Sequence, residues 1–197
     1  MLRKYVEKLK FGEHLSQEES YNCLSEIFLG NCELGQIKEL LLLLSEKGET
    51  VEEIVGFAIA MREKMLAVPI NKNAIDICGT GGTDKDRFNV STSISFILAA
   101  SGVPVAKHGN RGSKKPNGSF DFLEALDIKY DFSVKEIIDI FDSTELCFLF
   151  ARNHHMAVKH VAMARKELGR RTIFNMIGPL CNPAKVPFQI IGTVSES

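Results

Sequence analysis

The sequence lacks an apolar run that could cross a bilayer, and its most apolar segment, Leu40 to Leu44, is far shorter than the ~20 residues of a membrane-spanning helix. The N-terminal residues also lack the apolar stretch of a secretion signal. An excess of either charge is missing too, because the formal net charge is -1 across 197 residues. We therefore expect a cytoplasmic protein without a membrane or nucleic-acid partner, in which any anion site comes from a local cluster of donors.

Cysteine is scarce, and no pair has a Cys-x-x-Cys spacing. The five cysteines are Cys23, Cys32, Cys78, Cys147 and Cys181. An odd, scattered set argues against a disulfide framework and against a zinc site, so we expect reduced thiols in the core. His154, His155 and His160 lack carboxylate or cysteine neighbours at ligand spacing and do not predict a metal site.

Residues 16–66 have the apolar periodicity of helices. Two capping boxes, Ser16 with Glu19 and Thr50 with Glu53, mark helix starts. An apolar stripe at i, i+3, i+4 and i+7 lies between them: Ile37, Leu40, Leu41 and Leu44. We predict a helical domain over residues 1–70, and we expect the stripe to need a partner surface, which favours a homodimer.

The pattern changes after a polar, proline-broken segment at residues 68–73. Beyond it, short apolar runs predict strands at 74–78, 103–106, 146–150 and 188–194, and helices are predicted at 91–101, 120–126, 134–141 and 157–168. This alternation indicates an α/β domain over residues 74–197 with a central, mostly parallel sheet. Residues 156–185 are expected to contribute hinge and helical-domain elements.

A glycine-rich loop follows the first predicted strand, with Gly79, Gly81 and Gly82 close together. Glycine lets the backbone approach a ligand and turn its N–H groups inward. Residues 89–92 (Asn-Val-Ser-Thr) then open a helix whose N-terminus favours phosphate. A tight turn followed by a simple helix cap is the alternative, and neither a P-loop nor a dinucleotide fingerprint is matched. Together, the strand, the glycines and the capped helix favour a phosphate site.

A basic, glycine-rich segment at residues 107–119 follows the second predicted strand, where open α/β sheets bind ligands. The alternative is a solvated surface loop, but Lys107 follows a buried strand directly and needs a partner for its charge. A third segment, residues 164–184, begins at a helix end and is broken by Gly178-Pro179 and Asn182-Pro183. It predicts a connector that bends at fixed points, and Arg165 taken alone would be a surface arginine.

In order and spacing these segments resemble the anthranilate phosphoribosyltransferase family over essentially the whole chain. The matching motifs are Gly79-Thr80-Gly81-Gly82, Phe88 to Thr92, Lys107 to Arg111, Gly118-Ser119 with Leu123 to Leu126, and Arg165 to Gly169 through Asn182-Pro183-Ala184. The resemblance implies a nucleoside-phosphorylase-like phosphoribosyltransferase architecture, in which a small helical domain and a large α/β domain flank the active site. It also implies that anthranilate and phosphoribosyl pyrophosphate are the small-molecule substrates.

The resemblance further implies site residues. Those for phosphoribosyl pyrophosphate are Gly79, Gly82, Thr83, Arg87, Asn89, Val90, Ser91, Thr92, Lys107, His108, Gly109, Asn110, Arg111, Gly112, Ser113, Lys114, Lys115 and Ser119. Gly79, Asn110 and Arg165 would face anthranilate, Ser91 would bind Mg²⁺, and Lys107 would stabilise pyrophosphate electrostatically without a general base.

Some positions depart from the family pattern, which usually has aspartate at Thr83, threonine at Arg87, and serines at Lys114 and Lys115. The acidic pair that binds magnesium in the family belongs to a later part of the sequence, so we expect the sheet to be incomplete. Two other functions stay open: a related pyrimidine-nucleoside phosphorylase, and a non-catalytic phosphoribosyl-pyrophosphate-binding or assembly module.

Overall fold

The computed structural model describes residues 2–80, 88–112 and 115–193. The chain divides into two compact units. The helical unit comprises Met1–Met65 with His155–Cys181, and the α/β unit comprises Leu66–His154 with Asn182–Ser197. Within the part of the chain that is described, no helix is both long and apolar enough to span a membrane. All five cysteines are free thiols, and all but Cys32 are buried, as predicted.

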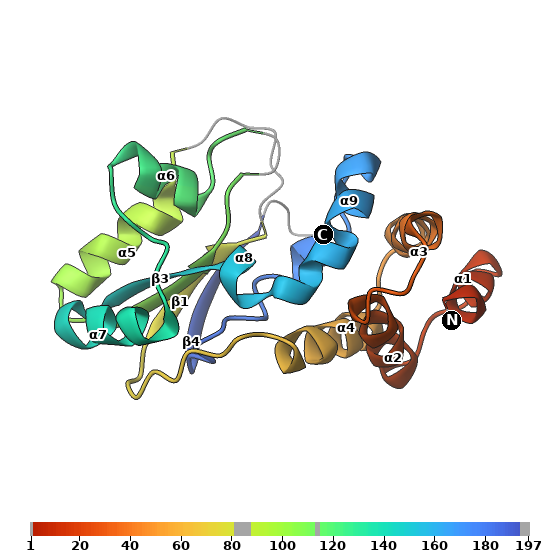
Figure 1. Cartoon of the computed structure of the whole chain (residues 1–197), viewed down its shortest axis with the longest axis horizontal. Helices are drawn as coiled ribbons and strands as arrows, with labels where there is room; N and C mark the ends of the chain where they lie inside the picture. Colours follow the sequence, from red (N-terminus) through yellow and green to blue (C-terminus); the bar gives the residue numbers. More distant parts are fainter. Residues whose placement is uncertain (1, 81–87, 113–114, 194–197) are drawn as a thin grey trace. The chain divides into compact units, whose positions relative to one another are not determined.

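The helical unit contains four helices from the N-terminal segment and three short elements from the later segment (Figure 1). They are α1 (Arg3–Lys10), α2 (Gln17–Phe28), α3 (Leu34–Lys47), α4 (Val51–Glu63), the 3₁₀ turn η1 (Met156–Val158), α9 (Lys159–Leu168) and α10 (Phe174–Ile177). Both predicted capping boxes are present: Ser16 caps α2 with Glu19, and Thr50 caps α4 with Glu53. The sequence did not predict α1 or α10, which are short.

The apolar stripe of α3 is buried within the helical unit. Ile37, Leu40 and Leu44 are at most 3% exposed. Helices α1 and α9 pack against α3, and Val161 and Ala164 of α9 belong to the same core cluster. The expectation that this stripe needs a surface outside the chain was therefore wrong, because α1 and a helix from more than a hundred residues downstream cover it.

Glu53 is a fully buried carboxylate that ties α4 to two neighbouring segments. Its Oε1 accepts a hydrogen bond from the Leu15 N–H (2.9 Å), and its Oε2 accepts bonds from the Thr50 N–H (2.8 Å) and from Lys47 Nζ (2.9 Å). Burial raises the pKa of Glu53, but these donors outweigh burial, so the pKa lies below its ordinary value of 4.5. The charged form is the one that the fold stabilises.

Replacing Glu53 with glutamine is expected to lower the free energy of unfolding at pH 7 by about 2–3 kcal/mol, because the bonds from charged and backbone donors lose their anionic acceptor. Since the folded pKa is depressed, this stabilisation is present above pH 4.5 and is lost as pH falls through the folded pKa. Denaturant titrations across this range would measure it, with the exposed Glu52→Gln as the matched control. A variant that keeps the wild-type acid dependence would contradict the assignment.

The α/β unit is built on a parallel four-stranded sheet in the order β3-β2-β1-β4 (Figure 1). The strands are β1 (Ile75–Gly79), β2 (Val105–Gly109), β3 (Leu146–Phe150) and β4 (Phe188–Gly192). The helices are α5 (Val90–Ala100), α6 (Ser119–Ala125), α7 (Val134–Thr144) and the short α8 (Ala151–His154), which was not predicted. The predicted fold class, a small helical domain followed by an α/β domain with a parallel sheet, is confirmed.

Helices cover both faces of this sheet. Successive residues of a strand point to opposite faces. Cys147 and Leu149 of β3 share a core cluster with Phe141 of α7, whereas Phe150 of β3 packs with Phe120 of α6. The three layers hold the carboxyl ends of the strands at one edge, which is where the predicted ligand loops begin.

Strand β2 differs from its prediction at its carboxyl end. The sequence predicted a strand ending at Ala106, but β2 continues to Gly109, so Lys107 and His108 lie inside it. Both side chains are buried, at 2% and 5% exposure. The prediction failed because it used apolar character to define buried strands, and here two ionisable residues occupy buried strand positions.

Candidate functional site

The candidate site lies at the carboxyl ends of β1 and β2, which end at Gly79 and Gly109. The two strands are parallel neighbours, so these ends lie at the same edge of the sheet. Gly79 is exposed, and the Thr80 N–H donates to Gly192 O of β4 (3.0 Å). The β1 end is thus bound to β4 on one side, while its glycine is open to a ligand.

The N-terminus of α5 is capped by Asn89, whose Oδ1 accepts the Thr92 N–H (3.2 Å). Val90 at the first turn is 54% exposed, and Ser91 is half-buried. A helix N-terminus carries partial positive charge and attracts anions. Residues 89–92 therefore form the N-cap and first turn of α5, where the sequence predicted a helix start, and they leave a hydroxyl, Ser91 Oγ, on the first turn.

The loop after β2 is held to α6 and to α5. Asp121 Oδ2 accepts the N–H groups of Gly112 (2.7 Å) and Gly118 (2.8 Å). Asn89 Nδ2 donates to the Asn117 carbonyl (3.2 Å). The loop therefore lies beside the α5 N-terminus, so two segments that the sequence predicted separately are neighbours in the α/β unit.

Arg111 uses its guanidinium within this loop. It bonds Glu124 of α6 through both terminal nitrogens, and its Nη2 donates to the Tyr130 hydroxyl (2.5 Å). Asn110 is exposed, and its Oδ1 accepts the Arg111 N–H (2.8 Å). Arg111 therefore ties the loop to Glu124 and Tyr130, whereas the Asn110 side chain is exposed.

Ser119 and Lys115 differ in burial, although both belong to the segment after β2. Ser119 is buried at the start of α6 and lies against Gly109, where an added Cβ would meet Ser119 Oγ at 2.9 Å. Lys115 is exposed. The small residue at Gly109 thus lets α6 approach the end of β2 closely.

Lys107 is buried between β1 and β2. Its Nζ donates to the Ile77 carbonyl (2.5 Å) and lies 3.4 Å from the His108 carbonyl. Burial lowers the pKa of Lys107, while the charge of Asp76 raises it. Burial likewise raises the pKa of Asp76, which hydrogen bonding by Asn182 and the charge of Lys107 lower again. Burial is the largest influence on both groups, so the pKa of Lys107 lies below its ordinary value and that of Asp76 lies above it.

Asp76 lies in the first predicted strand, residues 74–78, but the sequence did not predict a role for it. The signal was present, because an aspartate inside a buried apolar strand needs a partner of its own. Its partner, Lys107, was found only as a loop cation. Asp76 is fully buried, and its carboxylate accepts the His108 N–H (3.0 Å) and Gln189 Nε2 (3.0 Å).

Arg165 lies on α9 and belongs to the helical unit, whereas the residues described above belong to the α/β unit. Its guanidinium carbon lies 5.2 Å from the centroid of the Phe174 ring. Burial lowers the pKa of Arg165. A guanidinium held near an aromatic ring offers a planar fork of donors, which suits a carboxylate.

The structure gathers most predicted site residues in one unit. Those at the β1 and β2 ends, the α5 N-terminus and the following loop are Gly79, Asn89, Val90, Ser91, Thr92, Lys107, His108, Gly109, Asn110, Arg111, Gly112, Lys115 and Ser119. Five predicted residues lie outside the described residues: Gly82, Thr83, Arg87, Ser113 and Lys114. Across residues 2–80, 88–112 and 115–193, no group of three or more His, Cys, Asp or Glu side chains is arranged to hold a metal ion.

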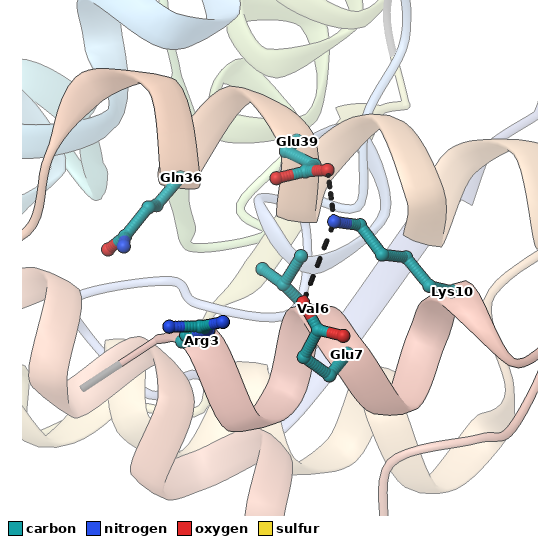
Figure 2. A pocket seen from close by; sticks show the side chains of 6 residues that line it. All are labelled: Arg3, Val6, Glu7, Lys10, Gln36 and Glu39. Atoms are coloured by element: carbon teal, nitrogen blue, oxygen red, sulfur yellow. Dashed lines mark ion pairs between the residues drawn. The ribbon is translucent and has the colours of Figure 1, made fainter.

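The helical unit has a polar cleft of its own, between α1 and α3 (Figure 2). Figure 2 shows Lys10 of α1 pointing to Glu39 of α3 (2.9 Å) and to Glu7 (3.6 Å). Arg3, Val6 and Gln36 complete the lining. No predicted substrate residue lines this cleft, and its ion pair between Lys10 and Glu39 joins α1 to α3.

Comparison with known families matches the chain to two models. Residues 3–65 match the helical bundle domain of a glycosyl transferase family, and residues 71–197 match the a/b domain of that family. Among curated relatives, the anthranilate phosphoribosyltransferase of Shouchella clausii (strain KSM-K16) is 43% identical, over 100% of this chain and 58% of its own length. That of Bacillus caldotenax is also 43% identical, over 99% of this chain and 81% of its own length.

Solved structures give the same match. The crystal structure of anthranilate phosphoribosyltransferase from Thermus thermophilus superposes with a TM-score of 0.90 at 40% identity, over 97% of this chain and 58% of that one. The enzyme from Saccharomyces cerevisiae in complex with PRPP and Mg superposes with a TM-score of 0.89 at 28% identity, over 99% of this chain and 59% of that one. The chain thus spans less than two thirds of most of these relatives.

Proposed function

The chain belongs to the anthranilate phosphoribosyltransferase family, and from this we propose that the protein transfers the phosphoribosyl group of phosphoribosyl pyrophosphate to the amine of anthranilate. The products are phosphoribosylanthranilate and pyrophosphate, in tryptophan biosynthesis. One observation in the α/β unit supports the proposal most directly: the Asn89–Asn117 hydrogen bond joins the α5 N-terminus to the loop after β2, beside the strand ends. Two sets of phosphate donors thereby form one anion site.

In the proposed reaction, the lone pair of the anthranilate nitrogen forms a bond to the anomeric carbon of the ribose. The bond from that carbon to the pyrophosphate oxygen breaks, and pyrophosphate leaves with the electron pair. An aromatic amine is largely unprotonated at neutral pH, so it can attack without first losing a proton. The nitrogen becomes positively charged when the new bond forms, and it then releases one proton to solvent. The chain therefore needs no dedicated strong base, and catalysis rests on positioning and on charge.

Different residues are assigned to the phosphates, to the departing pyrophosphate and to anthranilate. Gly79, the α5 N-terminus and the loop from Gly109 to Ser119 surround the phosphates, and the positive end of the α5 dipole attracts their charge. Lys107 stabilises the negative charge on the departing pyrophosphate. Asn110 and Arg165 face anthranilate, where the Arg165 fork pairs with its carboxylate through two hydrogen bonds.

Among the residues that the structure describes, the Ser91 hydroxyl is chemically suited to magnesium. Hard cations take oxygen ligands, and Mg²⁺ commonly binds through a few protein oxygens together with substrate phosphates. Ser91 offers such an oxygen on the first turn of α5, at the same place as the phosphate donors. When bound, magnesium would neutralise charge on the pyrophosphate, and Ser91 would be its ligand from this chain.

The proposal is tested by following anthranilate fluorescence with the gene product that carries this chain, in the presence of phosphoribosyl pyrophosphate and Mg²⁺. We expect anthranilate to be consumed, and chelation by EDTA to abolish consumption. Persistence of anthranilate, together with phosphate-dependent cleavage of a pyrimidine nucleoside, would replace this function by the phosphorylase reaction. Tight binding of phosphoribosyl pyrophosphate without turnover would replace it by a binding module.

We also propose that the protein is cytoplasmic and acts as a homodimer. The helical unit supports dimerisation only through its outer surface, because the α3 stripe is already covered. Sedimentation velocity at micromolar concentration would give twice the chain mass, and a monomer mass there would overturn the dimer. Cell fractionation would test the location.

A further inference from the structure

Strands β1 and β2 part after one residue pair. Their register pair is Ile75 with Val105, whereas β1 with β4, and β2 with β3, pair over their whole lengths. At the start, the Ile75 N–H donates to the Pro104 carbonyl (2.9 Å), as a regular parallel ladder requires. The regular pairing of β1 with β2 therefore ends inside the sheet, before the strands reach Gly79 and Gly109.

Polar side chains satisfy backbone groups along this separation. A regular ladder would continue with bonds from Ile77 N–H to Ala106 O and from His108 N–H to Ile77 O. Instead, the His108 N–H donates to Asp76 Oδ1 (3.0 Å), and Lys107 Nζ donates to the Ile77 carbonyl (2.5 Å). Asn182 Nδ2 donates to the Ala106 carbonyl (2.9 Å). Three side chains thus occupy the place of the ladder.

Two of these three side chains are charged and almost fully buried. Asp76 is 0% exposed and Lys107 is 2% exposed. A buried charge is costly unless it is compensated, and here each of the two residues stabilises the charged form of the other. Both residues lie within three positions of the strand-end glycines, Gly79 and Gly109, where the predicted phosphate loops begin.

We propose that Asp76 is a positioning residue for the reaction: it holds Lys107 charged and oriented between the separated ends of β1 and β2, ready for the pyrophosphate. The inference rests on the proposed function, since it specifies how that site keeps a buried ammonium. Asp76 touches no substrate and acts only through Lys107 and the strand ends.

The other groups around Lys107 leave this task to Asp76. Cys78 of β1 and Cys147 of β3 are thiols whose pKa burial raises to about 12, so both are neutral at physiological pH. Gln189 of β4 is uncharged and donates to Asp76 Oδ2 (3.0 Å). His108 of β2 contributes its backbone N–H to Asp76. Among the described residues, Asp76 is thus the carboxylate whose charge opposes the effect of burial on the pKa of Lys107.

The test replaces Asp76 with asparagine, which keeps an oxygen for the His108 N–H but removes the charge. We expect kcat/KM to fall at least 10-fold at pH 8, with the alkaline limb of its pH profile moved to lower pH by about one unit or more. A purely structural role would lower activity equally at every pH. Asp127→Asn is the matched control, because Asp127 is exposed and asparagine tolerates its positive φ of 56°.

A second measurement does not require the variant to be active. Titration of the Lys107 Nζ signal by NMR in the wild-type protein should show a charged lysine at pH 7, and in Asp76→Asn its midpoint should fall. A neutral Lys107 in the wild type, or an unchanged midpoint in the variant, would overturn the inference. If Asp76→Asn fails to fold, the wild-type titration alone decides.

The two proposals fail in different ways. An active wild type whose Asp76→Asn variant keeps the same pH profile would refute the positioning role and leave the transferase function standing. An inactive wild type in which Asp76→Asn still lowers the Lys107 midpoint would refute the function and leave the electrostatic pairing standing.

Discussion

Replacing Lys107 with methionine is expected to lower kcat/KM for phosphoribosyl pyrophosphate by about 10²–10³-fold, the usual effect of removing one preorganised group that stabilises developing charge. Methionine has a similar length and fills the buried space between β1 and β2. The lost quantity is therefore the charge, together with the hydrogen bond to the Ile77 carbonyl. Steady-state assays of anthranilate consumption would give the ratio.

The control for Lys107→Met is Lys135→Met, which removes an exposed lysine from α7 in the same unit. It should leave kcat/KM within about 2-fold of the wild type, because surface charges far from a site are screened. Calorimetry should be run on both variants to separate loss of fold from loss of chemistry. A folded Lys107→Met enzyme with wild-type turnover would show that the pyrophosphate needs no charge from this position.

The second large effect is expected at Gly118, where the loop after β2 enters α6. A Cβ added here would lie within clash distance of the backbone of Asn110, Arg111 and Gly112. Backbone atoms cannot rotate away as a flexible side chain can, so Gly118→Ala must displace the loop. Overpacking costs about 1–3 kcal/mol, which corresponds to a rise of about 5- to 150-fold in the dissociation constant of phosphoribosyl pyrophosphate if binding restores the native loop.

Isothermal titration with phosphoribosyl pyrophosphate would measure this change. Gly35→Ala is the matched control, since an added Cβ on α3 meets no atom within 4 Å and the glycine has ordinary backbone angles. Unchanged affinity in Gly118→Ala would mean that the loop does not hold the phosphates.

Local sequence patterns predicted the elements whose residues follow a single rule. The capping boxes at Ser16 and Thr50 and the apolar strand Leu146–Phe150 match the structure, because side-chain chemistry alone defines them. The predicted end of β2 does not match the structure. Lys107 is buried inside this strand, and its Nζ donates to the Ile77 carbonyl of β1. No window of sequence shows such a pairing, which depends on β1 and β2 being neighbours.

The same limit applies to the candidate site. Its glycines and its capped helix were found from the sequence, because each has a local signature. Arg111 donates to Glu124 and Tyr130, and Asp121 accepts two loop N–H groups. These contacts could not be predicted locally, because they depend on how α6 and the residues after it fold back on the loop. Asp76 was overlooked because its partners come from β2 and β4, far along the chain.

The discontinuity of the helical unit matters during synthesis. The α3 stripe is covered partly by α9, and residue 155 follows residue 65 by 90 positions (155 − 65). At about 5–20 residues per second, the ribosome takes roughly 5–18 s to synthesise the segment between residues 65 and 155. Pulse proteolysis of ribosome-bound chains should find α3 cleavable until α9 has emerged. For that interval the nascent helices present a row of leucines to solvent, and the speed of translation itself sets how long a chaperone has to shield them.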